Sequence, residues 1–177
     1  KNHKKLYFES RNLKLNGFLV NSINDNEVLE YLKKNNFEVG VFAGVGIVKK
    51  LVIDKFSKFC LNAHPGPLPE IRGSGALEWT LYFNLKPSIS VHTACKQIDS
   101  GKLIRKKEIK VSKKDTFFLL NEKLKIECTK LMAEICKDVD NIIYIEPVKS
   151  LGKLNKWKDC KIEVQKKAWR NFSRLKS

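Results

Sequence analysis

The chain has 177 residues, of which 42% are hydrophobic, and carries a formal net charge of +16. This length and apolar content suit one globular domain with a sizeable core, and they argue against an intrinsically disordered chain. No apolar run is long enough to span a bilayer, and the first five residues contain no apolar signal-peptide region. We therefore expect a cytoplasmic protein without a membrane partner.

The five cysteines form no C-x-x-C pair and are odd in number. That pattern favours reduced, buried thiols in a reducing compartment. It also argues against a structural zinc site, so no metal is expected.

The positive charge is uneven along the chain. Residues 149–177 hold ten Lys or Arg against two acidic residues, a net of +8. Such a segment can attract a polyanion, a nucleotide phosphate or a polyglutamylated folate tail. The alternative is a lysine-rich composition with solvated side chains, or a partly ordered tail. Nucleic acid binding is therefore open but not favoured.

In chain order, the apolar pattern predicts alternating strands and helices. They are a strand at 17–20, a helix capped by Asn24 with Glu27 three residues on, a strand at 39–43, a helix at 47–56, a strand at 59–61, a helix at 75–83, strands at 88–94 and 103–111, and a long helix capped by Asp115. The run at 39–43 does not alternate, as is typical of a strand buried on both faces. This series predicts an α/β fold, a Rossmann-like parallel sheet with helices on both faces.

The stretch 61–73, LNAHPGPLPEIRG, contains three prolines and two glycines. Proline fixes φ and lacks an N–H, so the segment is predicted to be a shaped loop that follows the strand at 59–61. Asn62 and His64 are two residues apart, and at the end of a strand such residues face one side. In a parallel sheet this is where ligand sites lie, beyond the carboxyl ends of the strands.

A second polar segment, SVHTACKQIDSG at 90–101, adds His92 and Asp99. By itself an Asp-Ser-Gly sequence is usually a turn, and a lone histidine is more often structural than catalytic.

Together the two segments read N-x-H-P-x-x-L-P-x-x-R-G followed by V-H-x-x-x-x-x-I-D-x-G. This pattern resembles the folate-dependent formyltransferases, a family that includes glycinamide ribonucleotide transformylase, methionyl-tRNA formyltransferase and amino-sugar N-formyltransferases. The resemblance covers roughly residues 25–109. It implies that Asn62 and His64 donate hydrogen bonds to a tetrahedral oxyanion, and that Asp99 orients His64 and relays a proton.

The resemblance also implies 10-formyltetrahydrofolate as the formyl donor and a small amine as its partner. The implied cofactor-binding residues are Val45, Gly46, Ile47, Val48 and Ile98, and the implied substrate-binding residues are Arg72, Gly73 and His92. Alternatives stay open for several of them. Residues 45–48 could form an ordinary turn, Arg72 could be solvated, and His92 could be structural.

Relative to the family, the usual first strand–helix unit is expected to be lacking, and residues 1–148 are predicted to form the catalytic domain, with 149–177 as a basic C-terminal segment. The second domain of the tRNA enzymes does not fit into the last forty residues. The predicted function is formyl transfer to a small-molecule amine, such as a nucleotide-linked amino sugar or glycinamide ribonucleotide. The alternatives are a methionyl-tRNA formyltransferase-like protein, a deformylating hydrolase and a non-catalytic folate- or nucleotide-binding module. A homodimer is a further expectation.

Overall fold

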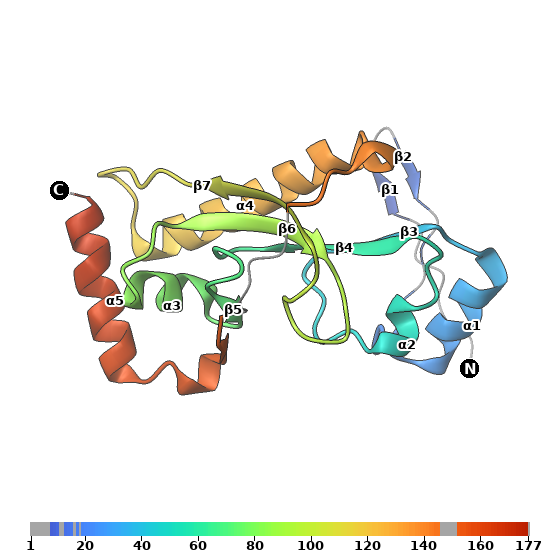
Figure 1. The fold of residues 1–177 in the computed structure, drawn as a ribbon, viewed down its shortest axis with the longest axis horizontal. Helices are drawn as coiled ribbons and strands as arrows, with labels where there is room; N and C mark the ends of the chain where they lie inside the picture. The colour runs from blue at the N-terminus through green and yellow to red at the C-terminus, as the bar shows by residue number, and fades with distance from the viewer. Residues whose placement is uncertain (1–7, 11–12, 16, 18, 146–151, 177) are drawn as a thin grey trace.

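A computed structural model describes residues 8–10, 13–15, 17, 19–145 and 152–176 (Figure 1). Its largest sheet has four strands in the order β3-β4-β6-β7. These strands are β3 (Val39–Phe42), β4 (Phe59–His64), β6 (Ser88–Thr93) and β7 (Leu103–Glu108). The other strands of the described residues form two two-stranded sheets. One pairs β1 (Phe8–Ser10) with β2 (Leu13–Leu15), and the other pairs β5 (Arg72–Gly73) with β8 (Leu154–Asn155).

The helices lie between and after these strands. They are α1 (Asn26–Asn35), α2 (Lys50–Ile53), α3 (Ala76–Tyr82), α4 (Phe117–Cys136) and α5 (Ile162–Leu175), with short 3-10 helices η1 (Val139–Asn141) and η2 (Trp157–Asp159). In the described part of the chain, no helix is long and apolar enough to cross a membrane.

The prediction of an α/β fold is confirmed, but the sheet is mixed rather than parallel. β3 and β4 pair in parallel, whereas β4 pairs antiparallel with β6, and β6 antiparallel with β7. The short connection between β6 and β7 explains the second of these antiparallel pairs. Residues 94–102 return the chain directly to the neighbouring strand, which only an antiparallel pair allows, because a parallel pair needs a crossover of a dozen or more residues.

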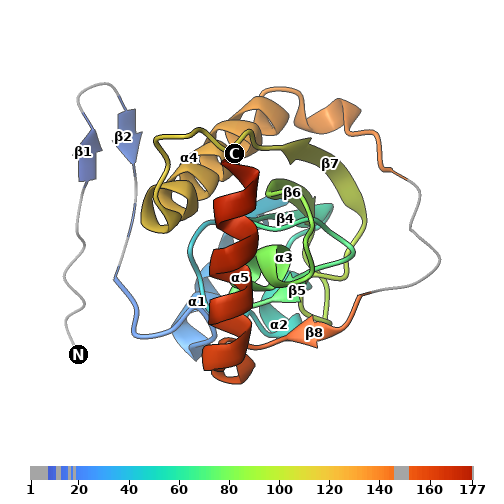
Figure 2. The same cartoon turned by 90° about the vertical axis from the view of Figure 1, so that its left-hand side faces the viewer.

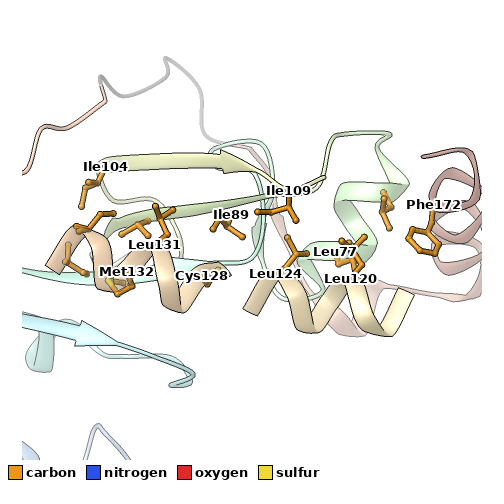
Figure 3. Packing of buried hydrophobic residues seen from close by; sticks show 14 of the residues in the cluster. Leu77, Ile89, Ile104, Ile109, Leu120, Leu124, Cys128, Leu131, Met132 and Phe172 are labelled. Carbon is orange, nitrogen blue, oxygen red and sulfur yellow. The ribbon is translucent and has the colours of Figure 1, made fainter. Parts of the chain in front are cut away.

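Helices cover both faces of this sheet, as predicted. On one face α4 lies along β4 and β6, and its buried side chains share one cluster with Leu61, Ile89 and Val91 (Figure 3). The α4 residues in that cluster recur at spacings of three and four: Leu120, Leu124, Cys128, Leu131 and Ile135. α3 and α5 extend the same cluster through Leu77, Leu81, Ala168 and Phe172.

The opposite face of β3 and β4 is covered by residues that follow α2. Phe42 meets Phe56 edge-on at 6.4 Å between ring centroids, and the Cys60 thiol lies 3.8 Å from the carbonyl of Ile53. Gly40 leaves the room for Phe56, because a Cβ there would lie 2.9 Å from the Phe56 ring. α1 and α2 pack on each other beyond this point through Val28, Leu32 and Val52.

Several predicted elements differ from the structure. Residues 17, 19 and 20 are not in a strand, and residue 18 lies outside the described residues; the described strands ahead of α1 are instead the hairpin β1–β2. β3 is at an edge of the sheet, so Val41 is 47% exposed rather than buried. The helix predicted at 47–56 is regular only over Lys50–Ile53, and β7 ends at Glu108, short of the predicted residue 111.

Both predicted helix caps are displaced by one residue. α1 begins after Asp25 rather than Asn24, and α4 begins after Thr116, whose hydroxyl accepts a hydrogen bond from the Leu119 amide, rather than after Asp115. Asp115 instead accepts a bond from the Ser112 amide. Asn24 instead bonds to the backbone of Ile47 and Lys49.

The described part of the basic C-terminal segment packs against the rest of the chain. β8 pairs in parallel with β5, and α5 crosses α3 (Figure 2). The buried amide of Asn171 donates to the Leu81 carbonyl at 2.7 Å, which ties α5 to α3. The sequence did not predict this helix; the boundary predicted at residue 148 stays a prediction.

Candidate active site

The carboxyl end of β4 opens into a cavity of about 490 Å³. Asn62 and His64 belong to β4 itself, which runs to His64, so the strand predicted to end at residue 61 is three residues too short. Both side chains line the cavity, together with His92 from β6 and Asp99 from the loop between β6 and β7. The predicted convergence of Asn62, His64 and Asp99 is therefore present, and we call these three residues with His92 the polar wall.

His64 is buried and its ring is held on both sides. Nε2 lies 3.0 Å from the carbonyl of Ile71, and Nδ1 lies 3.5 Å from Oδ2 of Asp99. A carbonyl only accepts, so Nε2 carries the proton of the neutral ring. Gly66 leaves the space this ring needs, since a Cβ there would lie 2.8 Å from Nε2. Nδ1, facing Asp99, is then the position that can gain or release a proton.

Asp99 receives contacts from three directions. Its Oδ2 accepts a hydrogen bond of 2.8 Å from the Gly73 amide, and its Oδ1 lies 3.5 Å from Nε2 of His92. Burial alone would raise the pKa of Asp99, but the His92 ring, the His64 ring and the Gly73 N–H outweigh it and hold that pKa below its ordinary value. Asp99 is therefore a carboxylate at neutral pH.

The pKa of His64 is also below its ordinary value. Burial is the main cause, and His92 adds to it, while the Asp99 carboxylate and the Ile71 carbonyl oppose the shift. At neutral pH the pair thus consists of a carboxylate and a neutral imidazole. That is the state in which Nδ1 can accept a proton and Asp99 can stabilise the resulting charge.

His92 orients the Asn62 carboxamide. The Nδ1 of His92 lies 2.9 Å from the Thr93 carbonyl, and its Nε2 lies 3.2 Å from Nδ2 of Asn62. With the ring proton on Nδ1, the ring donates to Thr93 and the Asn62 amide donates to Nε2; a proton on Nε2 would instead face Asp99 Oδ1, the contact that lowers the pKa of Asp99. One of the two amide N–H groups is used in this way, and the second is left for a reacting oxygen. At 2% exposure, His92 acts on the cavity chiefly through Asn62 and Asp99.

Residues 44–48 also line the cavity, and we call them the loop wall. Three of the implied cofactor-binding residues are apolar here, and Ile47 is 71% exposed. Asn24 ties the loop to the start of α1. Its amide donates to the Ile47 carbonyl at 2.8 Å, and its side-chain oxygen accepts from the Lys49 amide at 2.7 Å.

The remaining predicted residues lie at the rim of the cavity or behind it. Ile98 and Gly73 line the cavity. Arg72 is buried at 8% exposure, and its guanidinium donates to the carbonyls of Ile98 and Gly152. Its predicted contact with substrate stays a prediction, and its bonds in this structure favour the different role argued below.

The cavity lining also includes residues that were not predicted. Lys96 lies beside the polar wall, and Leu154, Asn155 and Lys156 arrive from the C-terminal segment. No sequence signal pointed to the latter three beyond the positive charge of their segment, because they reach the cavity through the pairing of β8 with β5. Among the described residues, no group of three or more His, Cys, Asp or Glu side chains could hold a metal ion.

Comparison with known proteins identifies the family. The pattern of the formyl transferase family matches residues 3–135. The chain therefore belongs to the formyl transferase family. A methionyl-tRNA formyltransferase from Rickettsia typhi is 24% identical over 159 residues, which covers 80% of this chain and 52% of the relative.

Solved structures share the fold. The formyltransferase PseJ from Anoxybacillus kamchatkensis, determined with a UDP-linked formamido sugar and tetrahydrofolate, has a TM-score of 0.63 at 23% identity, covering 71% of this chain and 68% of that one. A sugar N-formyltransferase from a Shewanella species has a TM-score of 0.68 at 18% identity, covering 85% and 65%. The chain spans about half the length of the curated relatives it matches first.

Proposed function

We propose that this protein transfers a formyl group from 10-formyltetrahydrofolate to a primary amine of a small molecule. The observation that carries the proposal is the convergence of Asn62, His64 and Asp99 on one cavity of about 490 Å³, whose lining also includes the apolar side chains of the loop wall. Folate fits this division, because its pterin ring can lie against the loop wall while the formyl group reaches the polar wall. Family membership and the tetrahydrofolate bound in a solved relative support the choice of donor.

The polar wall supplies what the reaction needs. The amine nitrogen forms a bond to the formyl carbon, and the formyl oxygen becomes negatively charged in the tetrahedral intermediate. The free N–H of Asn62 donates to that oxygen, and the positive charge that His64 gains when it is protonated stabilises it further; one such donor is typically worth ~3–4 kcal/mol in the transition state. The bond from carbon to the folate nitrogen then breaks, and the proton lost by the amine reaches that nitrogen by way of His64 and Asp99 or a water between them.

A nucleotide-linked amino sugar is the substrate class we favour. Lys96 and Lys156 lie on the edge of the cavity, where cationic side chains favour a phosphorylated substrate. Two of the solved relatives are sugar N-formyltransferases, and an N-formyltransferase from Helicobacter canadensis was determined with dTDP-3-aminofucose. Glycinamide ribonucleotide carries the same two features, an amine and a phosphate.

Turnover of 10-formyltetrahydrofolate tests this proposal. Release of tetrahydrofolate is followed with UDP- and dTDP-linked amino sugars, with glycinamide ribonucleotide, with methionyl-tRNA and without any amine. Release that depends on one amino sugar supports the proposal. Release without an amine identifies a deformylating hydrolase, and binding of folate without release under any condition identifies a non-catalytic module.

A methionyl-tRNA formyltransferase-like activity is the second candidate. The observation that favours it is the exposed face of α5, where Lys166 and Arg170 flank the half-exposed ring of Trp169. Phosphate binding releases counterions, so affinity for tRNA should fall steeply as salt is raised. A gel shift over a salt series decides, and weak binding without preference for tRNA removes this candidate.

A further inference from the structure

The loop that carries Asp99 is held in a conformation that a free loop would rarely adopt. Residues 94–102 join β6 to β7, and Asp99 has a φ of +48°. Non-glycine residues are uncommon in this left-handed region, so contacts from elsewhere must hold Asp99 there. Because its carboxylate has to sit beside the His64 ring, these contacts determine the geometry of the candidate site.

The contacts come from three consecutive residues, Ile71, Arg72 and Gly73. The Ile71 carbonyl accepts from Nε2 of His64 at 3.0 Å, and the Gly73 amide donates to Asp99 Oδ2 at 2.8 Å. Between them, the Arg72 side chain turns toward the peptide that precedes Asp99. One short segment thus holds both members of the His64–Asp99 pair.

Arg72 makes the most extensive of these contacts. Its Nε and Nη2 both donate to the Ile98 carbonyl, at 3.0 and 2.7 Å, and its Nη1 donates to the Gly152 carbonyl at 3.2 Å. Gly152 leads into β8, whose residues Leu154 and Asn155 also line the cavity. The guanidinium therefore joins the Asp99 loop and the C-terminal segment to β5.

We propose that Arg72 is a positioning residue that sets the Asp99 carboxylate against the His64 ring by holding the Ile98 carbonyl. A planar guanidinium can place two N–H groups on one carbonyl and a third on another at the same time. A lysine ammonium keeps the charge but lacks this fork. The kinetic part of the inference rests on the proposed formyl transfer, whereas the hold on the loop does not.

The test compares Arg72→Met and Arg72→Lys with Arg105→Met as a matched control. Arg105 lies on β7 with its side chain 55% exposed, outside the cavity. Hydrogen exchange of backbone amides over 94–102 is measured in the free proteins, alongside kcat and KM for folate and for the amine, across a pH series.

We expect the backbone amides of residues 94–102 to exchange faster in both Arg72 variants than in the wild-type protein. In the Arg105→Met control they should exchange at the wild-type rate. kcat should fall on the order of tenfold to a hundredfold in Arg72→Met, as misplacement of a reacting group by about 1 Å costs. The fall in kcat should be smaller in Arg72→Lys. KM for the amine should be unchanged in both Arg72 variants. The acidic limb of the pH profile of kcat should be shifted.

Two results would overturn the inference. One is wild-type exchange over 94–102 in both Arg72 variants. The other is a raised KM for the amine that Arg72→Lys restores with kcat intact, because that pattern marks a charge contact with substrate. If the wild-type protein transfers no formyl group, the proposed function fails, and the exchange data still decide whether Arg72 holds the loop.

Discussion

The two sides of the cavity are built in different ways. In the polar wall, the side chains of His64, His92 and Asp99 are almost fully enclosed and meet hydrogen-bonding groups of β5, β6 and one another. The loop wall presents exposed apolar side chains, and Asn24 ties it to α1. The difference separates two tasks, because charge that develops in a reaction needs donors already in place, while a flat ring needs apolar area to cover.

Removing the ring of His64 should have the largest effect. We expect His64→Ala to lower formyl transfer by roughly a hundredfold or more, because a general acid–base and the positive charge it places near the oxyanion are lost together. The dissociation constant for folate should stay within about twofold, since the pterin is assigned to the loop wall. Stopped-flow turnover and fluorescence titration measure the two quantities.

The division of tasks between the two walls would be contradicted if the rate of formyl transfer and the affinity for folate fell together. Loss of folate affinity in folded His64→Ala would mean that the polar wall also binds the cofactor. Unchanged turnover would make His64 a structural residue.

Removing the anchor of the loop wall should have the opposite signature. Asn24→Ala deletes two hydrogen bonds, each worth about 1 kcal/mol net, so folate affinity should fall roughly five- to thirtyfold. kcat at saturating folate should be unchanged, because no atom of the polar wall moves. Asn26→Ala, at the exposed first residue of α1, is the control. A fall in kcat with affinity intact would show that Asn24 acts on the chemistry instead.

The smallest expected effect concerns stability and pH. The pKa of His64 is lowered on folding, so the folded state keeps this ring neutral where the unfolded chain protonates it. The contribution of this group to the free energy of unfolding is fully present above a pH of about 6.5, the ordinary pKa of a free imidazole. It is lost as the pH falls from there through the lower pKa that the ring has in the folded protein. The lowered pKa of Asp99 acts with the same sign in more acidic solution.

Urea unfolding at pH 7.5 and pH 5 measures this contribution. The free energy of unfolding should be lower at pH 5 for the wild type. His64→Gln, which cannot titrate, should show a smaller difference between the two values. A wild-type protein that is more stable at pH 5 would contradict a buried neutral ring.

The sequence predicted which residues converge at the candidate site better than it predicted the strand directions and helix boundaries around them. The spacing of Asn62, His64 and Asp99 is carried by local motifs, so these residues could be identified without knowledge of the strand order. The direction of β6 was not predicted, although the loop that follows it contains the turn sequence Asp-Ser-Gly. Both helix caps were predicted one residue too early, because the residue chosen has another partner. Asn24 bonds to Ile47 and Lys49, and Asp115 accepts from the Ser112 amide.

Residues held by distant contacts were the ones missed. Asn24 reads as a helix cap until its bonds to Ile47 and Lys49 are seen, and Leu154–Asn155 reach the cavity through pairing with a strand eighty residues earlier. For Arg72 the substrate contact stays a prediction, but its bonds to the Ile98 and Gly152 carbonyls were not foreseen, because nothing local points to them. Long-range pairing of this kind leaves no periodicity in the sequence.

The central claim is that Asp99 works with His64 in formyl transfer and does not hold the cofactor. Single-turnover release of tetrahydrofolate by Asp99→Asn, with the enzyme saturated with 10-formyltetrahydrofolate and the preferred amine, tests it most directly. The account predicts a rate lowered by roughly a hundredfold or more, at an unchanged folate dissociation constant. A rate within about threefold of wild type in a folded variant that binds folate normally would contradict it.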